Sequence, residues 1–182
     1  MIYVVKFTGK FGFIKPWTAV RDELTFSQQF LTPSIVEGIE KKLFPELLSE
    51  KGIKKIMRHK LQYKSVSIQQ EVTQARGEDK KGNRSRSILS RGILIDPVLY
   101  LAFDNQADAD AAITQHICLC RNEDVLLPDA EFIQMNEDDF TLMDGFELRF
   151  GESMQSFKVG YNRYDGAKPM CGWLEFNGRS LL

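Results

Sequence analysis

The chain has 182 residues, of which 43% are hydrophobic and 27% charged, a composition typical of one soluble domain with an apolar core. Its three cysteines, an odd number, argue against a disulfide framework and favour a reducing compartment, so we expect a cytoplasmic protein. The longest apolar stretch, Gly92–Phe103, is interrupted by Asp96-Pro97, and no basic and then apolar leader opens the chain. The composition excludes membrane-spanning, collagenous and wholly disordered proteins, and we expect no secretory signal.

The net charge of −1 conceals a strong polarity along the chain. Residues 1–50 are balanced, with six Lys or Arg and six Asp or Glu. Residues 51–91 carry twelve basic side chains against three acidic ones, whereas residues 92–182 carry six against sixteen. Two interpretations follow: the middle segment binds an anionic partner, or a solvated basic hairpin balances an acidic half within one fold.

The first third of the chain predicts a strand, a loop and a helix. Ile2–Phe7 is rich in β-branched and aromatic residues and predicts a core strand, while the glycines, Pro16 and aromatics of Thr8–Leu31 predict a structured loop. A helix begins at Thr32-Pro33-Ser34, with Thr32 as the N-cap, and ends near Pro45. Its apolar stripe is Ile35, Val36, Ile39, Leu43 and Phe44, with Glu37, Glu40 and Lys41 outside it.

The rest of the chain predicts mainly strands. Leu61–Ile68 is extended, residues 71–92 form a polar hairpin tip or insertion, and Ile93–Phe103, apolar on both faces, is one buried central strand. Asn105 caps a second helix over Gln106–Gln115. Further strands are expected at His116–Leu119, Phe132–Met135, Phe146–Phe150, Phe157–Tyr161 and Trp173–Phe176. This order predicts an α+β protein with a ferredoxin-like βαββαβ core, a basic β-hairpin insertion at about 64–92 and an acidic, β-rich part at about 136–182.

Sequence motifs of common enzymes are absent: there is no nucleotide-binding glycine loop, nucleophile elbow or zinc-protease helix. Gly9-Lys10-Phe11-Gly12 is better explained as a loop that needs positive φ than as a phosphate cradle. His116-Ile-Cys118-Leu-Cys120 places three possible metal ligands on one strand face, but only the remote Cys171 is left as a fourth. We therefore expect no metal, no cofactor and no small-molecule substrate.

His59 lies in Arg58-His59-Lys60, among cations that would lower its pKa and favour the neutral ring. It is either a general base for RNA cleavage, with Tyr63 as a possible helper, or an ordinary solvated histidine.

The basic segment also fits single-stranded nucleic acid, which is held by cationic grooves and aromatic platforms. The cations that could contact phosphate are Lys54, Lys55, Arg58, Lys60, Lys64, Arg76, Lys80, Lys81, Arg84, Arg86 and Arg91. The possible platforms are Phe11, Phe13, Trp17, Phe26, Phe30 and Tyr63, although most of these aromatics also suit a core.

Three stretches resemble a known family. Phe7–Phe13 followed by Phe30–Ile39 resembles the opening strand, glycine-rich loop and T-P-S-x-x-x-G-[IL] helix start of the CRISPR-associated RAMP proteins, specifically the Cas-five family. Arg84–Leu89 running into Asp96–Tyr100 is similar to that family's return strand, and Leu119–Glu123 occupies the place of its L-G-R-[ST]-E turn, with Cys120 in the position of the glycine. The resemblance covers about residues 1–135.

The resemblance implies a subunit that grips the 5′ handle of crRNA in a Class 1, Cascade-like effector complex of a prokaryotic cytoplasm. Its partners would be the crRNA, the backbone RAMP subunits and a large subunit, and its thumb hairpin would project into the RNA and a neighbouring subunit. No membrane would be involved. The RNA-binding residues predicted from the resemblance and the basic segment are Lys10, Phe11, Lys15, Trp17, Thr32, Ser34, Arg58, Lys64, Arg76, Lys80, Lys81, Arg84, Arg86, Arg91 and Arg121.

One branch of the family is itself the repeat-processing ribonuclease, and it uses a Tyr before the T-P-S motif and a Lys-His pair after the thumb. Here no Tyr lies between Tyr3 and Tyr63, and Ile95-Asp96-Pro97 stands where the pair would be. We therefore expect a non-catalytic subunit of a divergent subtype. The alternatives are a metal-independent repeat endoribonuclease using His59 with a nearby Lys or Tyr63, and an unrelated protein-interaction module with a basic hairpin.

Overall fold

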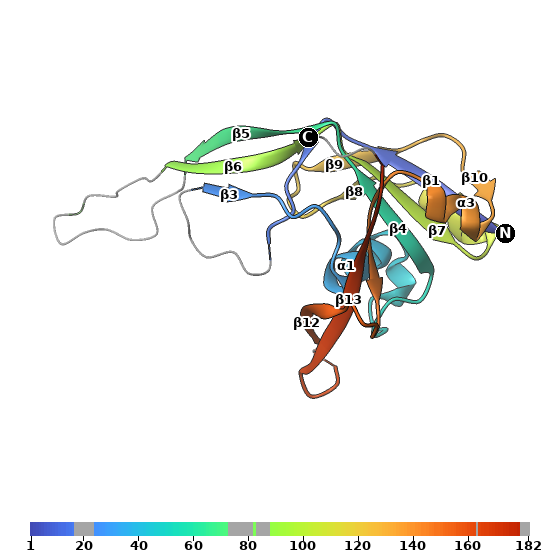
Figure 1. Ribbon diagram of the computed structural model, residues 1–182. Helices are drawn as coiled ribbons and strands as arrows, with labels where there is room; N and C mark the ends of the chain where they lie inside the picture. Colours follow the sequence, from blue (N-terminus) through green and yellow to red (C-terminus); the bar gives the residue numbers. More distant parts are fainter. Residues whose placement is uncertain (17–23, 73–81, 83–87, 163, 179–182) are drawn as a thin grey trace.

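The computed structural model describes residues 1–16, 24–72, 82, 88–162 and 164–178 (Figure 1). The centre of its main sheet consists of β1 (Ile2–Thr8), β4 (Ile56–Gln62), β7 (Val98–Phe103) and β9 (Val125–Pro128). These strands lie in the order β4-β7-β1-β9, and every neighbouring pair is antiparallel. Helix α1 (Pro33–Leu43) lies between β1 and β4 in the chain, and α2 (Gln106–Ala112) between β7 and β9. The predicted ferredoxin-like core is confirmed.

The two faces of this sheet are covered by different helices. On one face Val5, Phe7, Leu99 and Leu101 are fully buried in a core that also contains residues of α1 and α2. On the other face Ile2, Val4 and Ala102 contact Phe140 of α3 (Glu137–Leu142), a short helix that the sequence did not predict. Because β1 carries apolar side chains on both faces, with Val5 and Phe7 on one and Ile2 and Val4 on the other, the strand is buried on both sides.

Helix α1 begins where the sequence predicts, with Pro33 at its first position and Thr32 as the N-cap. The carbonyl of Thr32 accepts the backbone N–H groups of Ile35 and Val36, while its side chain makes no capping bond. The prediction that Glu37 and Glu40 lie outside the buried stripe is wrong, because both are buried. The Glu40 carboxylate accepts the backbone N–H groups of Lys54, Lys55 and Ile56 at 2.5–3.0 Å. It thereby fastens the segment that follows η1 (Pro45–Leu47) to the helix.

A second sheet contains β2 (Phe11–Gly12), β3 (Leu24–Phe26), β5 (Ser65–Val72) and β6 (Ile88–Ile95). Strands β5 and β6 pair antiparallel over eight residue pairs, from Ser65 with Ile95 to Val72 with Ile88. Figure 1 shows this hairpin extending away from the body of the molecule, with β3 alongside β6. The hairpin occupies the region where the sequence places the basic insertion, although residues 73–81 and 83–87 lie outside the described residues.

The prediction of one central strand over Ile93–Phe103 is wrong. The chain turns at Asp96-Pro97, where Asp96 has a φ of 47°, so β6 belongs to the second sheet and β7 to the main one. Proline has no N–H to offer a ladder, and its ring fixes the backbone of a turn. The apolar run Ile93–Phe103 therefore spans the end of β6 in one sheet and the whole of β7 in the other.

The C-terminal part extends the main sheet beyond β4. Strands β11 (Gly145–Phe150), β12 (Phe157–Asn162) and β13 (Lys168–Asn177) follow in the order β12-β13-β11-β4. On the opposite side, β8 (Ile117–Cys118) pairs with β9, and β10 (Ile133–Met135) pairs with the start of β1. Most of these strands were predicted within a few residues. The acidic C-terminal part is thus joined to the core through β4.

Candidate nucleic-acid interface

The base of the β5–β6 hairpin brings together three of the predicted RNA-binding residues, Lys10, Phe11 and Lys64, which we call the hairpin root. Phe11 pairs with Ile95, the Lys10 carbonyl accepts the Asp96 N–H, and the Lys64 N–H donates to the Ile95 carbonyl. Lys10 and Lys64 are exposed, and the side chain of Phe11 is partly open to solvent. The Lys64 ammonium lies 4.0 Å from the Asp96 carboxylate. Two cations and an aromatic residue from distant segments are therefore brought together at the base of the hairpin.

A second group of predicted residues surrounds the buried ring of Phe13. The guanidinium groups of Arg91 and Arg121 each lie 5.5 Å from its centroid. Glu71 of β5 contacts both, at 3.2 Å from Arg91 and 3.8 Å from Arg121. The hydrogen bonds that Arg121 donates to the Asp124 carboxylate raise the pKa of Arg121 above its ordinary value. Both guanidinium groups are thus held in place, and each remains about a quarter exposed.

Lys15 links these two groups to the turn after β8. It is exposed, and its backbone lies within hydrogen-bonding range of the Cys120 thiol, whose pKa is raised by burial. Lys15 therefore lies beside Arg121, in agreement with their assignment to one surface.

The glycines of Gly9-Lys10-Phe11-Gly12 are required for close packing, not for the positive φ that the sequence suggested. Neither glycine has a positive φ. A Cβ added to Gly9 would lie 2.7 Å from the carbonyl oxygen of Val125, and one added to Gly12 would lie 2.4 Å from a methyl group of Leu119. These glycines let the loop lie directly on β9 and on the turn before it.

Arg58, predicted to contact RNA, is instead buried on β4. Its side chain is 6% exposed and forms a bidentate pair with Glu147 of β11, at 2.6 and 2.9 Å. It also donates to the hydroxyl of Thr141 in α3. Burial opposes its charge, but Glu147 outweighs burial and keeps the pKa of Arg58 raised. Arg58 therefore joins the C-terminal part to the core and is not available to a ligand at the surface.

His59 and Tyr63, the predicted pair for RNA cleavage, are also withdrawn from the surface. The His59 ring is 2% exposed, stacks on Phe150 at 5.6 Å and hydrogen-bonds to the backbone of Leu31. Burial, with the charges of Arg149 and Arg58, lowers the pKa of His59 to about 3. Tyr63 is half-buried, stacks on Phe146 at 6.0 Å, and has a pKa raised by burial. The interpretation of His59 as an ordinary solvated histidine is wrong, because its neighbours enclose the ring.

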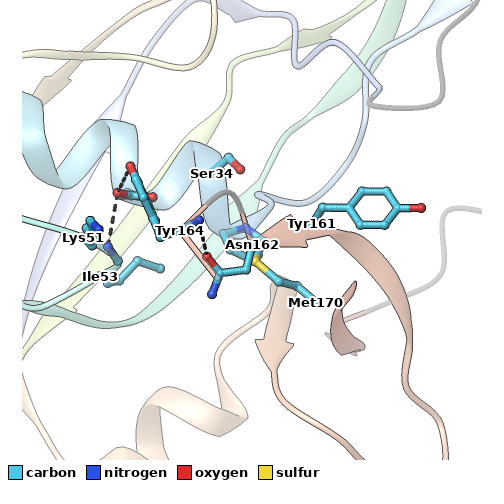
Figure 2. A pocket seen from close by; sticks show the side chains of 10 residues that line it. Ser34, Lys51, Ile53, Tyr161, Asn162, Tyr164 and Met170 are labelled. Carbon is cyan, nitrogen blue, oxygen red and sulfur yellow. Dashed lines mark hydrogen bonds between the residues drawn. The ribbon is translucent and has the colours of Figure 1, made fainter. Parts of the chain in front are cut away.

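Ser34 lines a small pocket of about 200 Å³ near the start of α1 (Figure 2). Tyr164 closes one side of it: its hydroxyl donates to Glu37 at 3.1 Å, and Lys51 lies 5.5 Å from its ring. Burial of Glu37 opposes its charge, but hydrogen bonds from Lys41, Tyr164 and Gly52 outweigh burial and lower the pKa of its carboxyl. Thr32, by contrast, is buried. The Glu37 carboxylate therefore holds Tyr164 against α1 at this pocket. Of the two predicted RNA-binding residues at the start of α1, Ser34 lines the pocket and Thr32 does not.

The remaining predicted RNA-binding residues lie outside the described residues. Trp17, Arg76, Lys80, Lys81, Arg84 and Arg86 belong to the segments that the structure leaves out. Within the described ranges no three His, Cys, Asp or Glu side chains are grouped to hold a metal ion. In the same part of the chain no helix is long and apolar enough to cross a membrane.

Comparison with known proteins gives a fold likeness. No family model matches the chain, and no curated protein matches it. Among solved structures, a chain of a CRISPR RNA-guided surveillance complex superposes with a TM-score of 0.58 and 9% identity, over 97% of this chain and 90% of that one. A Cas protein is matched with a TM-score of 0.48 and 13% identity, over 96% and 93%. The protein therefore has, over almost its whole length, the ferredoxin-like fold of a chain found in a CRISPR RNA-guided surveillance complex.

Proposed function

We propose that this protein is a non-catalytic, RNA-binding subunit of a CRISPR effector complex, which grips the 5′ handle of crRNA and caps the row of backbone subunits in antiviral or plasmid interference. The observation that carries this proposal is the β5–β6 hairpin, extending from a ferredoxin-like core whose fold matches a chain of an RNA-guided surveillance complex. The predicted partners are crRNA, the backbone RAMP subunits and a large subunit, in a prokaryotic cytoplasm.

The charges at the hairpin root support an RNA ligand. Lys10, Lys15 and Lys64 are exposed within one region, and Arg91 and Arg121 present guanidinium groups beside it. Single-stranded RNA is held through phosphate contacts with such cations and through stacking of bases on exposed rings. Phe11, 38% exposed beside Lys10, is available for stacking.

The two faces of the hairpin support two kinds of contact. Along β5, Ser65, Ser67, Gln69 and Glu71 alternate with an opposite face that carries Val66, Ile68 and Val72, and Ile88 of β6 lies on that second face. These four apolar side chains are 40–60% exposed. An exposed apolar face suits a protein neighbour better than a phosphate backbone. The polar face, which carries Arg91, would then face the RNA and the apolar face a neighbouring subunit.

A non-catalytic role is supported by the burial of His59 and by the side chains that stand before α1. Phe30 lies in the region where the ribonuclease branch carries a Tyr, and its ring contacts Phe157 edge-on at 6.2 Å. A phenyl ring has no group that donates or accepts a proton.

The direct test is purification of the tagged protein from its native host, with and without RNase, followed by sequencing of bound RNA. We expect short RNAs of uniform length that share one 5′ end, together with other subunits. Absence of RNA, with partners that survive RNase, would overturn the proposal in favour of a protein-interaction module.

The residue-level test uses charge reversal. The Lys10→Glu/Lys15→Glu/Lys64→Glu variant should lose RNA affinity, and the slope of log K against log salt should be about 2 units flatter, since each phosphate contact contributes about 0.7 for a single strand. The matched control, Lys54→Glu/Lys158→Glu/Lys168→Glu, changes net charge equally at exposed sites away from the hairpin root. Equal losses in both variants would refute the assignment of these lysines.

A further inference from the structure

A groove of about 480 Å³ runs between the exposed side of α1 and the segment that contains β8 and the turn after it. Helix α1 contributes Gly38 and Lys42, and the opposite wall contributes His116, Cys120 and Asn122. The groove therefore contains the His116–Cys120 motif. It is separate from the pocket of Figure 2, which shares no lining residue with it.

Gly38 has no explanation within the fold. Every other glycine among the described residues either has a positive φ or lies so close to a neighbour that a Cβ would collide. Gly38 is helical, and a Cβ added to it would meet nothing within 4 Å. A glycine inside a helix destabilises it relative to alanine, because glycine loses more backbone entropy on folding. Its effect here is a bare strip of helix backbone that a molecule from outside can approach closely.

The charges around the groove favour an anion. None of its lining residues is acidic, although the chain carries 25 Asp and Glu. Lys42 is an exposed cation at the rim, and Asn122 supplies an exposed amide. The floor is apolar, since Ile39, Ile117 and Leu119 are buried there. An apolar floor suits a flat base, an amide suits its polar edge, and a rim cation suits its phosphate.

The groove adjoins the surface assigned to RNA. Cys120, in its wall, lies within hydrogen-bonding range of the backbone of Lys15. Leu119, in its floor, is the residue that a Cβ on Gly12 would strike. One strand of RNA could therefore continue from the hairpin root into the groove.

We propose that this groove binds one nucleotide of the RNA strand that lies on the hairpin root, with its base against Gly38 and the apolar floor and its phosphate beside Lys42. The proposal rests on the RNA-binding function proposed above. The groove gives the RNA a second contact region, on α1, in addition to the one at the hairpin root.

The test compares two substitutions at Gly38, with a labelled single-stranded RNA of the host's CRISPR repeat as the probe. Gly38→Ala should raise the Tm by about 2–4 °C, because alanine favours the helix and meets nothing inside the chain. It should nevertheless weaken RNA binding, and Gly38→Leu should weaken it at least fivefold, about the effect of losing one stacked base. Lys42→Ala should flatten the salt slope by about 0.7, whereas Lys168→Ala should not.

Native thiols supply a second readout. Cys120 is exposed in the groove and Cys171 lies on β13, so bound RNA should slow alkylation of Cys120 at least fivefold and leave Cys171 unchanged. Unchanged RNA affinity in both Gly38 variants would overturn the groove while leaving the RNA-binding function intact. Loss of subunit assembly with unchanged RNA affinity would assign the groove to a protein and overturn the proposal. Failure of the wild-type chain to bind the probe would overturn both.

Discussion

The Arg58–Glu147 pair allows a quantitative test of how the C-terminal part is attached. The two side chains are 6% and 2% exposed, and two hydrogen bonds join them. In Glu147→Ala the guanidinium stays buried and charged without its bidentate partner, which costs about 3–5 kcal/mol for pairs of this kind. A domain of this length loses about 2.6 °C of Tm per kcal/mol, so we expect a fall of about 8–13 °C. Glu175, 3.8 Å from Arg58, offers only partial replacement.

Thermal unfolding at pH 7, followed by circular dichroism, measures this effect. The double variant Arg58→Met/Glu147→Leu should recover most of the lost stability, because it removes both charges and keeps apolar volume. Glu175→Ala is the matched control: its carboxylate is more than one third exposed, and its loss should shift Tm by less than about 2 °C. The reasoning fails if Glu147→Ala unfolds within about 2 °C of the wild type, or if the double variant is as unstable as the single one.

Two further predictions concern His59 and Gly12. Because folding lowers the pKa of His59 from 6.5 to about 3, the unfolded chain binds more protons between these values, and stability falls as the pH drops below 6.5, by about 1.4 kcal/mol per pH unit. In urea unfolding between pH 6 and pH 4, His59→Phe should therefore lose stability less steeply than the wild type, and parallel curves would contradict the burial of this ring. Gly12→Ala should lower the free energy of unfolding by about 1–3 kcal/mol, since its Cβ would lie 2.4 Å from the buried Leu119 side chain, and an unchanged Tm would show that Leu119 can move aside.

Local signals in the sequence predict elements well where one face is buried. The β-branched and aromatic residues of Ile2–Phe7 and the Thr32-Pro33 start signal identify β1 and α1, and the order of elements leads to the ferredoxin-like core. The same signals fail at Asp96-Pro97, where apolar residues continue while the chain changes sheet. Helix α3 was missed because, in its six residues, only Phe140 is buried, too few for a helical period.

The candidate interface was predictable only in outline. The excess of basic residues over 51–91 correctly locates the hairpin, but counting charges cannot distinguish Lys64, exposed at the root, from Arg58, whose partner lies 89 residues away. Likewise, the spacing of His116, Cys118 and Cys120 gives no sign of the groove that they line opposite a helix. Partners that are distant in the chain decide these roles.

Strand β11, the outer neighbour of β4 in the main sheet, is synthesised long after β4. At about 5–20 residues per second, a ribosome needs about 4–18 s after making Arg58 to reach Glu147, 89 residues later. Until then the edge of β4 has no partner, and an open strand edge is a template for pairing with another chain. Arg58 and Lys60 both belong to this strand, and inward-pointing charges discourage such pairing. We therefore expect the charges that are buried and satisfied in the folded protein to discourage pairing of the β4 edge with other chains during synthesis.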